Sequence, residues 1–160
     1  MASLKKTNAV RIMEGANVPF ELLEYEIDEE ALSAEDAAAK TNVPEEQTFK
    51  TLCARGDKIG VMMVCVPAGR ELDFKKLAAA SGNKSVELVH LKEVTALTGY
   101  VRGGCSPLDT KKKYPVFIDE TAILFDYITV NAGHRGLLFK LTADDLISVT
   151  EAVAADILRD

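Results

Sequence analysis

The sequence has no tryptophan, only two histidines and only three cysteines in 160 residues. The cysteines, Cys53, Cys65 and Cys105, form no C-x-x-C pair, and their odd number argues against a disulfide framework. Because only His90 and His134 could join them, no zinc site of the usual ligand spacing can be assembled from local motifs. We therefore expect free thiols, no metal site and no other cofactor.

Long apolar runs are missing too. Nowhere do about 18 apolar residues follow one another, as a membrane-spanning helix requires, and residues 1–20 lack the apolar core of about 7 to 15 residues of a secretory signal peptide. No repeat or linker divides the chain, whose 48% hydrophobic and 28% charged residues are typical of a soluble globular protein. We therefore expect one domain over residues 1–160, cytoplasmic and without a membrane partner, as a monomer or a weak homodimer.

Common catalytic motifs are also absent. The chain contains no Ser/His/Asp order, no P-loop, no G-x-G-x-x-G and no H-E-x-x-H. Any chemistry must therefore come from residues outside these motifs.

The acidic net charge of −6 is unfavourable for a general nucleic-acid binder, but the charge is uneven along the chain. Residues 61–140 carry 11 Lys+Arg against 8 Asp+Glu, whereas the segments before and after them have net charges of −5 and −4. The densest basic segment contains Arg102, Lys111, Lys112 and Lys113. It could bind a polyanion at one place, although three lysines in a row are more often a solvated loop.

Capping residues and apolar periodicity predict helices and strands in irregular alternation. Helices are expected from Ser3 or Thr7 to Gly15, over 33–40, over 73–82, over 91–99 and from Thr142 onward. Strands are expected over 19–27, 48–54, 58–66, 86–90, 115–119, 124–131 and 137–141, with turns at 55–57 and 132–136. This order favours a single α/β or α+β domain, with helices around a strongly curved, barrel-like mixed sheet, over a doubly wound nucleotide fold.

One lysine lies within a predicted strand. Lys50 shares a strand face with Leu52, whereas Phe49 and Thr51 point the other way. Such a lysine lies either at a sheet edge, with its ammonium in water, or in a cavity. In a cavity its charge could hold a carbonyl oxygen or a phosphate.

A glycine pair marks a second candidate site. Gly103 and Gly104 allow a ligand to approach the main chain closely, and their amides could bind an anion with Ser106 nearby, although a tight turn would need the same residues. Cys105 invites assignment as a nucleophile, but no neighbouring histidine could activate it. In a second glycine-bounded turn, Arg135 could bind a phosphate or form a structural ion pair.

Three segments, TFKTL (48–52), TGYVRGGCSPLDTKKK (98–113) and AGHRGL (132–137), together resemble the YbaK/EbsC family. Its members are freestanding relatives of the editing domain inserted in bacterial prolyl-tRNA synthetases. The resemblance extends over nearly the whole chain, and it implies the editing-domain fold and hydrolysis of misacylated tRNA, often cysteine or alanine on proline tRNA. It also implies catalysis without a metal or a covalent enzyme nucleophile, the thiol of a cysteinyl substrate attacking its own carbonyl.

The resemblance assigns roles to individual residues by their position in the shared motifs. Lys50 matches the required lysine, Gly103 and Gly104 match the glycine pair whose backbone faces the scissile ester, and Tyr25 matches an aromatic position of the pocket. We further expect substrate contacts at Thr51, Ser106, Asn131 and Arg135, and tRNA contacts at Arg102, Lys111, Lys112 and Lys113. The implied partners are proline tRNA and, in addition, prolyl-tRNA synthetase.

Three departures from the family pattern affect the transfer. The glycine that commonly follows Ser-Pro-Leu is Asp109 here, and the usual small-Gly-Gly-Lys-Arg-Gly turn is replaced by residues 131–136. A position that is often polar in the family is Leu138. Since these changes fall where side-chain specificity is expected, lysine-dependent hydrolysis carries over better than cysteine specificity.

Three functions are compatible with these features. The first, which we favour, is a trans-editing hydrolase that uses Lys50 and the Gly103-Gly104 backbone. The second is a non-catalytic module that binds tRNA or a synthetase through its basic segment. The third is a small-molecule thiol enzyme that uses Cys105.

Overall fold

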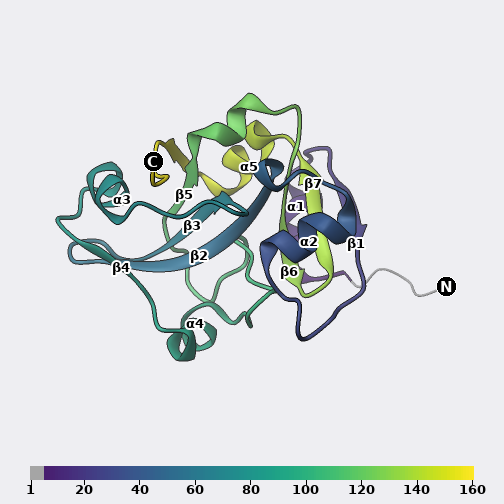
Figure 1. Cartoon of the computed structure of the whole chain (residues 1–160), viewed down its shortest axis with the longest axis horizontal. Helices are drawn as coiled ribbons and strands as arrows, with labels where there is room; N and C mark the ends of the chain where they lie inside the picture. The colour runs from purple at the N-terminus through teal and green to yellow at the C-terminus, as the bar shows by residue number, and fades with distance from the viewer. Residues whose placement is uncertain (1–5) are drawn as a thin grey trace.

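The computed structural model describes residues 6–160, which are built around one mixed sheet of eight strands (Figure 1). The strands are β1 (Glu21–Glu24), β2 (Thr48–Gly56), β3 (Gly60–Pro67), β4 (Val86–Leu88), β5 (Val116–Asp119), β6 (Ile128–His134), β7 (Leu137–Leu141) and β8 (Val153–Ala155). The helices are α1 (Asn8–Gly15), α2 (Ala34–Thr41), α3 (Phe74–Ser81), α4 (Leu91–Thr98) and α5 (Ala143–Thr150), with the 3-10 helices η1 (Glu45–Gln47) and η2 (Glu120–Leu124). The order across the sheet is β1-β7-β6-β2-β3-β5-β8, and β4 pairs with β2 outside this path.

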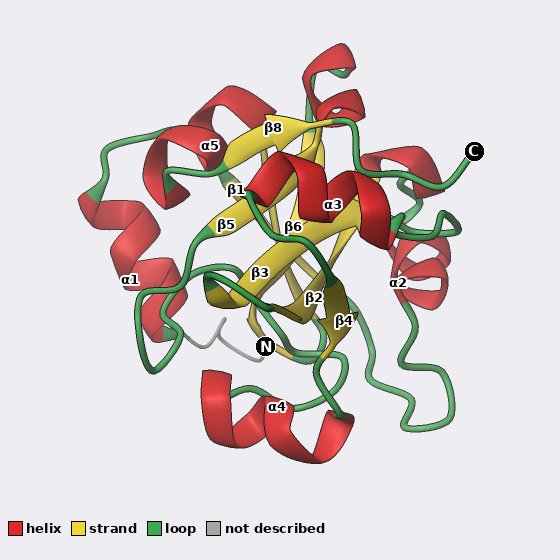
Figure 2. Ribbon diagram, turned by 90° about the vertical axis from the view of Figure 1, so that its left-hand side faces the viewer, coloured by secondary structure: helices red, strands yellow, loops and turns green. Residues whose placement is uncertain are grey.

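The sheet combines antiparallel and parallel pairs. Antiparallel pairing joins β2 to β3 and β6 to β7, whereas β2–β6, β3–β5 and β5–β8 are parallel. The helices lie around the curved sheet (Figure 2). The predicted single α/β domain with a mixed, curved sheet is therefore confirmed.

Side-chain caps determine where most of the helices begin, as the sequence predicted. Thr7, Ser33, Asp73 and Thr142 each accept a hydrogen bond from a backbone N–H in the first turn, and at Ser33 the bond is part of a reciprocal capping box. The alternative first cap, Ser3, lies outside the described residues. All five α-helices have eight residues. Among residues 6–160 no helix has the length and apolar character needed to cross a bilayer.

The first hairpin is present, but its turn was predicted two residues too early. Arg55 and Gly56 belong to β2, and residues 57–59 form the loop before Gly60. Gly60 has a φ of +76°, and Asn83 Oδ1 accepts hydrogen bonds from the amides of residues 58 and 59. A side chain distant in sequence thus determines the position of this turn.

The segment around β6 also differs from the prediction. Of its predicted residues, Leu124 ends η2 and residues 125–127 belong to no helix or strand, so the strand begins only at Ile128. It then continues to His134 through a β-bulge after Asn131, into a segment predicted as a turn. The short strand β8, which pairs with β5, was not predicted because three residues are too few for a recognisable alternation.

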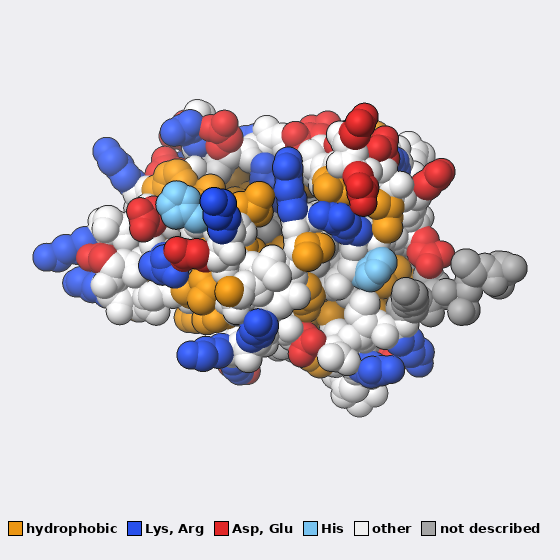
Figure 3. All heavy atoms as spheres, turned by 90° about the horizontal axis from the view of Figure 1, so that it is seen from below, with side chains coloured by type: hydrophobic (Ala, Val, Ile, Leu, Met, Phe, Trp, Pro, Cys, Tyr) orange, Lys and Arg blue, Asp and Glu red, His pale blue; other side chains and the backbone are white. Residues whose placement is uncertain are grey.

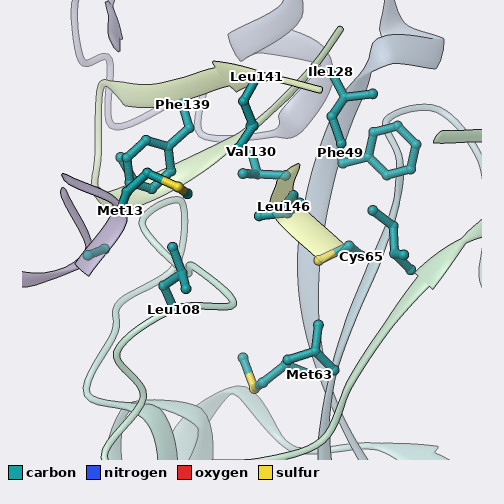
Figure 4. Close-up of a cluster of buried hydrophobic side chains, with 14 of the residues drawn as sticks. Met13, Phe49, Met63, Cys65, Leu108, Ile128, Val130, Phe139, Leu141 and Leu146 are labelled. Atoms are coloured by element: carbon teal, nitrogen blue, oxygen red, sulfur yellow. The ribbon is translucent and has the colours of Figure 1, made fainter. Parts of the chain in front are cut away.

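Both faces of the central strands are buried. On β3, Met63 and Cys65 belong to one hydrophobic cluster, whereas Met62 and Val64 belong to another. The first cluster lies where β2, β6 and β7 meet α1 and α5, and Figure 4 shows its members Met13, Phe49, Met63, Cys65, Leu108, Ile128, Val130, Phe139, Leu141 and Leu146. Burial on both faces explains the nearly continuous apolar sequence of β3.

One edge of β2 is incompletely paired. The strand pairs with β3 from Phe49 to Gly56, but on its other edge it pairs with β6 only at residues 48–49 and with β4 only at residues 54–56. Within the described residues, positions 50–53 therefore have no strand partner on that edge. This gap determines where the candidate site lies.

Candidate active site

A cavity of about 540 Å³ lies beside the unpaired edge of β2. Residues 48–53 of β2, the start of α2, the β4–α4 segment and the loop around Gly103 form most of its wall. Viewed from the side of α4, the surface presents apolar side chains interspersed with both basic and acidic ones (Figure 3). A concave site with mostly apolar walls and a few polar groups is the usual form of a small-ligand pocket.

Lys50 lies on this wall with its side chain half-buried. The two placements predicted for it, a sheet edge and a cavity, therefore coincide, since the cavity lies beside the unpaired edge of β2. Its neighbour on the same strand face, Leu52, packs against the second hydrophobic cluster. Within residues 6–160 no carboxylate forms an ion pair with Lys50. The charge of its ammonium is therefore available to a ligand.

The backbone of Thr51 adds polar groups to the same wall. Thr48 O accepts a hydrogen bond from Ala68 on the β3 side, whereas Cys53 O accepts one from Val89 on the opposite side. Because peptide groups alternate along a strand, the N–H and C=O of Thr51 face the same edge as those of Cys53, where β2 has its gap. The Thr51 hydroxyl instead lies 3.7 Å from a core thiol.

Glycine is needed at positions 103 and 104 for different structural reasons. Gly103 lines the cavity with a φ of +84°, and a Cβ there would lie 3.4 Å from Leu32. Gly104 is absent from the cavity wall: a Cβ there would lie 3.2 Å from Arg135 N, and its N–H donates to Val101 O at 3.0 Å. Of the two glycine N–H groups, only that of Gly103 has no hydrogen-bond partner among the described residues. The structure therefore makes Gly103, not the pair, the available backbone donor.

Asn131 borders the cavity, but its polar atoms are used within the protein. Its Nδ2 donates to Gly103 O at 3.0 Å and to His134 O at 3.1 Å. Its Oδ1 accepts from Gly133 N at 2.7 Å and from His134 N at 3.1 Å. The side chain thus stabilises the β6 bulge and joins it to the glycine loop, instead of presenting a free amide to a substrate.

Two further predicted substrate contacts lie away from the cavity wall. Arg135 donates through Nε to Arg102 O at 2.7 Å, so it holds the glycine loop from the β6–β7 turn. Ser106 is fully buried, and its Oγ accepts from Leu108 N at 3.2 Å. Both residues therefore support the loop that carries Gly103.

Tyr25 does line the cavity. Burial raises the pKa of its phenol above the ordinary value, and the hydrogen bond with the backbone of Gly136 only partly opposes this. The hydroxyl is therefore neutral at physiological pH, when it can donate a hydrogen bond.

The three cysteines are free, as the sequence predicted. Cys105 lies on the cavity wall, where burial, and secondarily the nearby Cys53 and Cys65, raises the pKa of its thiol to about 12. Because the thiolate is the reactive form, such a thiol is a poor nucleophile at neutral pH. This environment is unfavourable for the thiol-enzyme function.

The predicted tRNA-binding residues have different surroundings. Arg102 reaches the cavity wall. Lys113 forms an ion pair with Glu151 at 2.8 Å, whereas Lys111 and Lys112 have no ion pair within the described residues. Within the described residues, the charges of Lys111 and Lys112 are therefore not compensated by a carboxylate.

Two of the three family departures, Asp109 and Leu138, leave the local backbone undistorted. Asp109 adopts a φ of +57°, the left-handed conformation that glycine would supply and that aspartate tolerates better than most residues. Leu138 lies on the cavity wall, so this position is apolar in the pocket itself. Among the described residues, no cluster of three or more His, Cys, Asp or Glu side chains is suited to a metal ion.

Several residues of the cavity wall were not predicted from the sequence to belong to the site. Ser33 was recognised only as a helix cap, and the apolar residues Leu32, Leu91 and Val101 were not assigned to a site, although all line the cavity. Leu91 is 60% exposed in the structure, but exposure cannot be read from a helical pattern.

Comparisons with known proteins place the chain in a family. The sequence pattern of the aminoacyl-tRNA editing domain matches residues 28–149. A protein of Enterococcus faecalis named "Putative Cys-tRNA(Pro)/Cys-tRNA(Cys) deacylase EbsC" is 43% identical over 153 residues, 96% of this chain and 93% of that protein. A proline–tRNA ligase of Thermosipho africanus is 32% identical over 80 residues, 50% of this chain but 14% of the ligase.

Solved structures share the fold. One, described as a candidate trans-editing enzyme for prolyl tRNA synthetase, has a TM-score of 0.83 and 23% identity, with 98% of this chain and 100% of that chain covered. Another, the hypothetical protein APE2540, has a TM-score of 0.84 and 24% identity over 93% and 97% of the two chains. From the sequence match and this shared fold together, the chain belongs to the aminoacyl-tRNA editing domain family.

Proposed function

We propose that this protein is a trans-acting hydrolase that removes a wrongly attached amino acid from tRNA. The observation that carries the proposal is the presence, on one cavity wall, of the Lys50 ammonium and the Gly103 N–H, neither of which has a protein partner within residues 6–160. Membership of the editing-domain family supports this reaction class. The name of the Enterococcus relative supports Cys-tRNA(Pro) and Cys-tRNA(Cys) as the first substrates to test.

The proposed chemistry needs positioning and charge stabilisation. When the ester carbonyl is attacked, its oxygen gains negative charge, and a nearby N–H or ammonium donor can each contribute about 3 kcal/mol to stabilising it. We assign Gly103 N–H and Lys50 to that role. In a cysteinyl ester the substrate thiol gives up its proton and its sulfur attacks the carbonyl carbon of the same residue, the bond to the ribose oxygen breaks, and that oxygen leaves with the proton. Water then opens the resulting thiolactone and releases cysteine. The protein then needs neither a nucleophile of its own nor a metal.

The apolar part of the cavity wall favours an aminoacyl group whose side chain is small and uncharged. Leu32, Val101 and Leu138 line the cavity. A charged side chain would lose hydration against these apolar residues, whereas a cysteinyl or alanyl group would not. We therefore propose small neutral amino acids as the class removed.

The body of the tRNA would approach over Arg102, Lys111 and Lys112. The net charge of −6 disfavours tight binding by this protein alone, so we propose recruitment through a synthetase, with prolyl-tRNA synthetase the first choice. The similarity to part of a proline–tRNA ligase supports this choice. Such a reaction would take place in the cytoplasm.

The test is deacylation of proline tRNA charged in turn with cysteine, alanine and serine, and of cysteine tRNA charged with cysteine. We expect release of the small amino acid to be accelerated over the spontaneous rate and unchanged by prior treatment with a chelator. Salt-sensitive tRNA binding without acceleration of any ester would instead identify a non-catalytic binding module. Loss of activity with the chelator would remove the metal-free mechanism.

A further inference from the structure

Gly103 is held from both sides by the β6–β7 turn. A residue's φ and ψ are set by the peptide planes before and after its Cα. The carbonyl oxygen of the preceding plane, Arg102 O, accepts a hydrogen bond from Arg135 Nε at 2.7 Å. The carbonyl oxygen of the following plane, Gly103 O, accepts one from Asn131 Nδ2 at 3.0 Å. Both planes are therefore fixed.

The direction of the free N–H follows from this arrangement. In a trans peptide the N–H points away from the C=O of the same plane. Because Arg102 O is directed at the β6–β7 turn, the Gly103 N–H is directed away from it. Gly103 itself lies on the cavity wall, and no described residue accepts a hydrogen bond from its N–H.

We propose that Asn131 and Arg135 are positioning residues that lock Gly103 so that its N–H points at the substrate carbonyl. The inference rests on the proposed hydrolase function. Without the two hydrogen bonds, a glycine would sample many backbone conformations, and the donor would have to be ordered in each catalytic cycle. Neither side chain contacts the substrate in this scheme.

The chemistry of Asn131 fits this role. Its amide provides two donors, directed at two carbonyl oxygens, and an oxygen that accepts from two N–H groups. It is 9% exposed, so water cannot readily replace these bonds. An aspartate of the same shape would turn both donors into acceptors facing carbonyl oxygens. Position 131 therefore requires an amide.

Asn131→Asp tests the inference in the full-length protein. We expect kcat to fall about 10- to 100-fold, less than the about 10²- to 10³-fold cost of removing an oxyanion donor outright, with KM within about twofold. The amide resonance of Gly103 in a proton–nitrogen NMR spectrum should shift. A residue that bound the substrate equally in ground and transition states would instead raise KM and leave kcat unchanged.

Asn83 provides a matched control. It is 8% exposed, and like Asn131 it accepts two backbone N–H bonds in a hairpin, but it is absent from the cavity wall. Asn83→Asp should lower the melting temperature without changing kcat of the folded fraction or the Gly103 resonance. If Asn83→Asp lowers kcat as much as Asn131→Asp does, the effect is general destabilisation and the inference fails.

Arg135 allows a second test at a more exposed site. Arg135→Ala should lower kcat, and Arg135→Lys should recover part of the loss because an ammonium can still donate to Arg102 O. If Arg135→Ala raises KM in a salt-dependent way with kcat unchanged, the residue binds tRNA phosphate instead and its positioning role is wrong.

Failure of the inference and failure of the proposed function are distinguishable. Asn131→Asp and Arg135→Ala proteins that fold and hydrolyse at the wild-type kcat would overturn the inference and leave the function in place. A wild-type protein that hydrolyses none of the test esters would remove the function, and the inference with it.

Discussion

Replacing Lys50 is the most direct test of the proposed chemistry. The ammonium has no ion pair within the described residues, so its removal leaves no carboxylate unpaired. Lys50→Ala also deletes three methylene groups of a half-buried stem. At about 0.8 kcal/mol per fully buried methylene, the loss of stability is about 1 kcal/mol. Lys50→Met retains an apolar stem, so the charge can be removed with less change in packing.

The expected effect on catalysis is larger. Loss of one charged donor to the developing oxyanion should slow deacylation about 10²- to 10³-fold, equivalent to about 3 to 4 kcal/mol. The assay is single-turnover release of labelled cysteine from Cys-tRNA(Pro) at saturating protein, with urea unfolding of each variant alongside. A Lys50→Met protein that unfolds like the wild type and deacylates within about threefold of its rate would refute the assignment.

Three further predictions concern other residues. Cys105→Ala should deacylate at the wild-type rate, since its buried thiol has a pKa of about 12; a large loss of rate would revive the thiol-enzyme function. Charge reversal of Lys111 and Lys112 together should weaken tRNA binding and reduce its salt dependence, measured by filter binding, whereas reversal of the ion-paired Lys113 should have a smaller effect. Burial raises the pKa of the Cys65 thiol from 9.0 to about 12, so the folded state keeps a proton that the unfolded state loses. This contribution to the free energy of unfolding is complete below pH 9.0 and is lost as the pH rises towards about 12. Urea titrations from pH 8 to about 11 should show a steeper decline in the wild type than in Cys65→Ala, and equal slopes would contradict the shift.

Local signals predicted the elements that depend on neighbouring residues. The helix caps at Thr7, Ser33, Asp73 and Thr142 were correct because a side chain satisfies a backbone N–H three positions away. The predicted turn at 55–57 was wrong because a contact from Asn83 determines that loop. The glycine pair was recognised, but its division into a cavity donor at Gly103 and a packing residue at Gly104 depends on Arg135 N, which lies far along the chain.

The sequence by itself determined the class of fold, the family and two of the segments that form the site, because caps, strand alternation and motif residues are local. Only the tertiary structure decided three features of the described residues: one edge of β2 lacks a strand partner at residues 50–53, Lys50 has no ion pair, and Asn131 holds Gly103. Each of these depends on strands and loops that meet from distant parts of the chain. Their pairing is decided by packing and hydrogen bonding over the whole sheet, which no short segment contains.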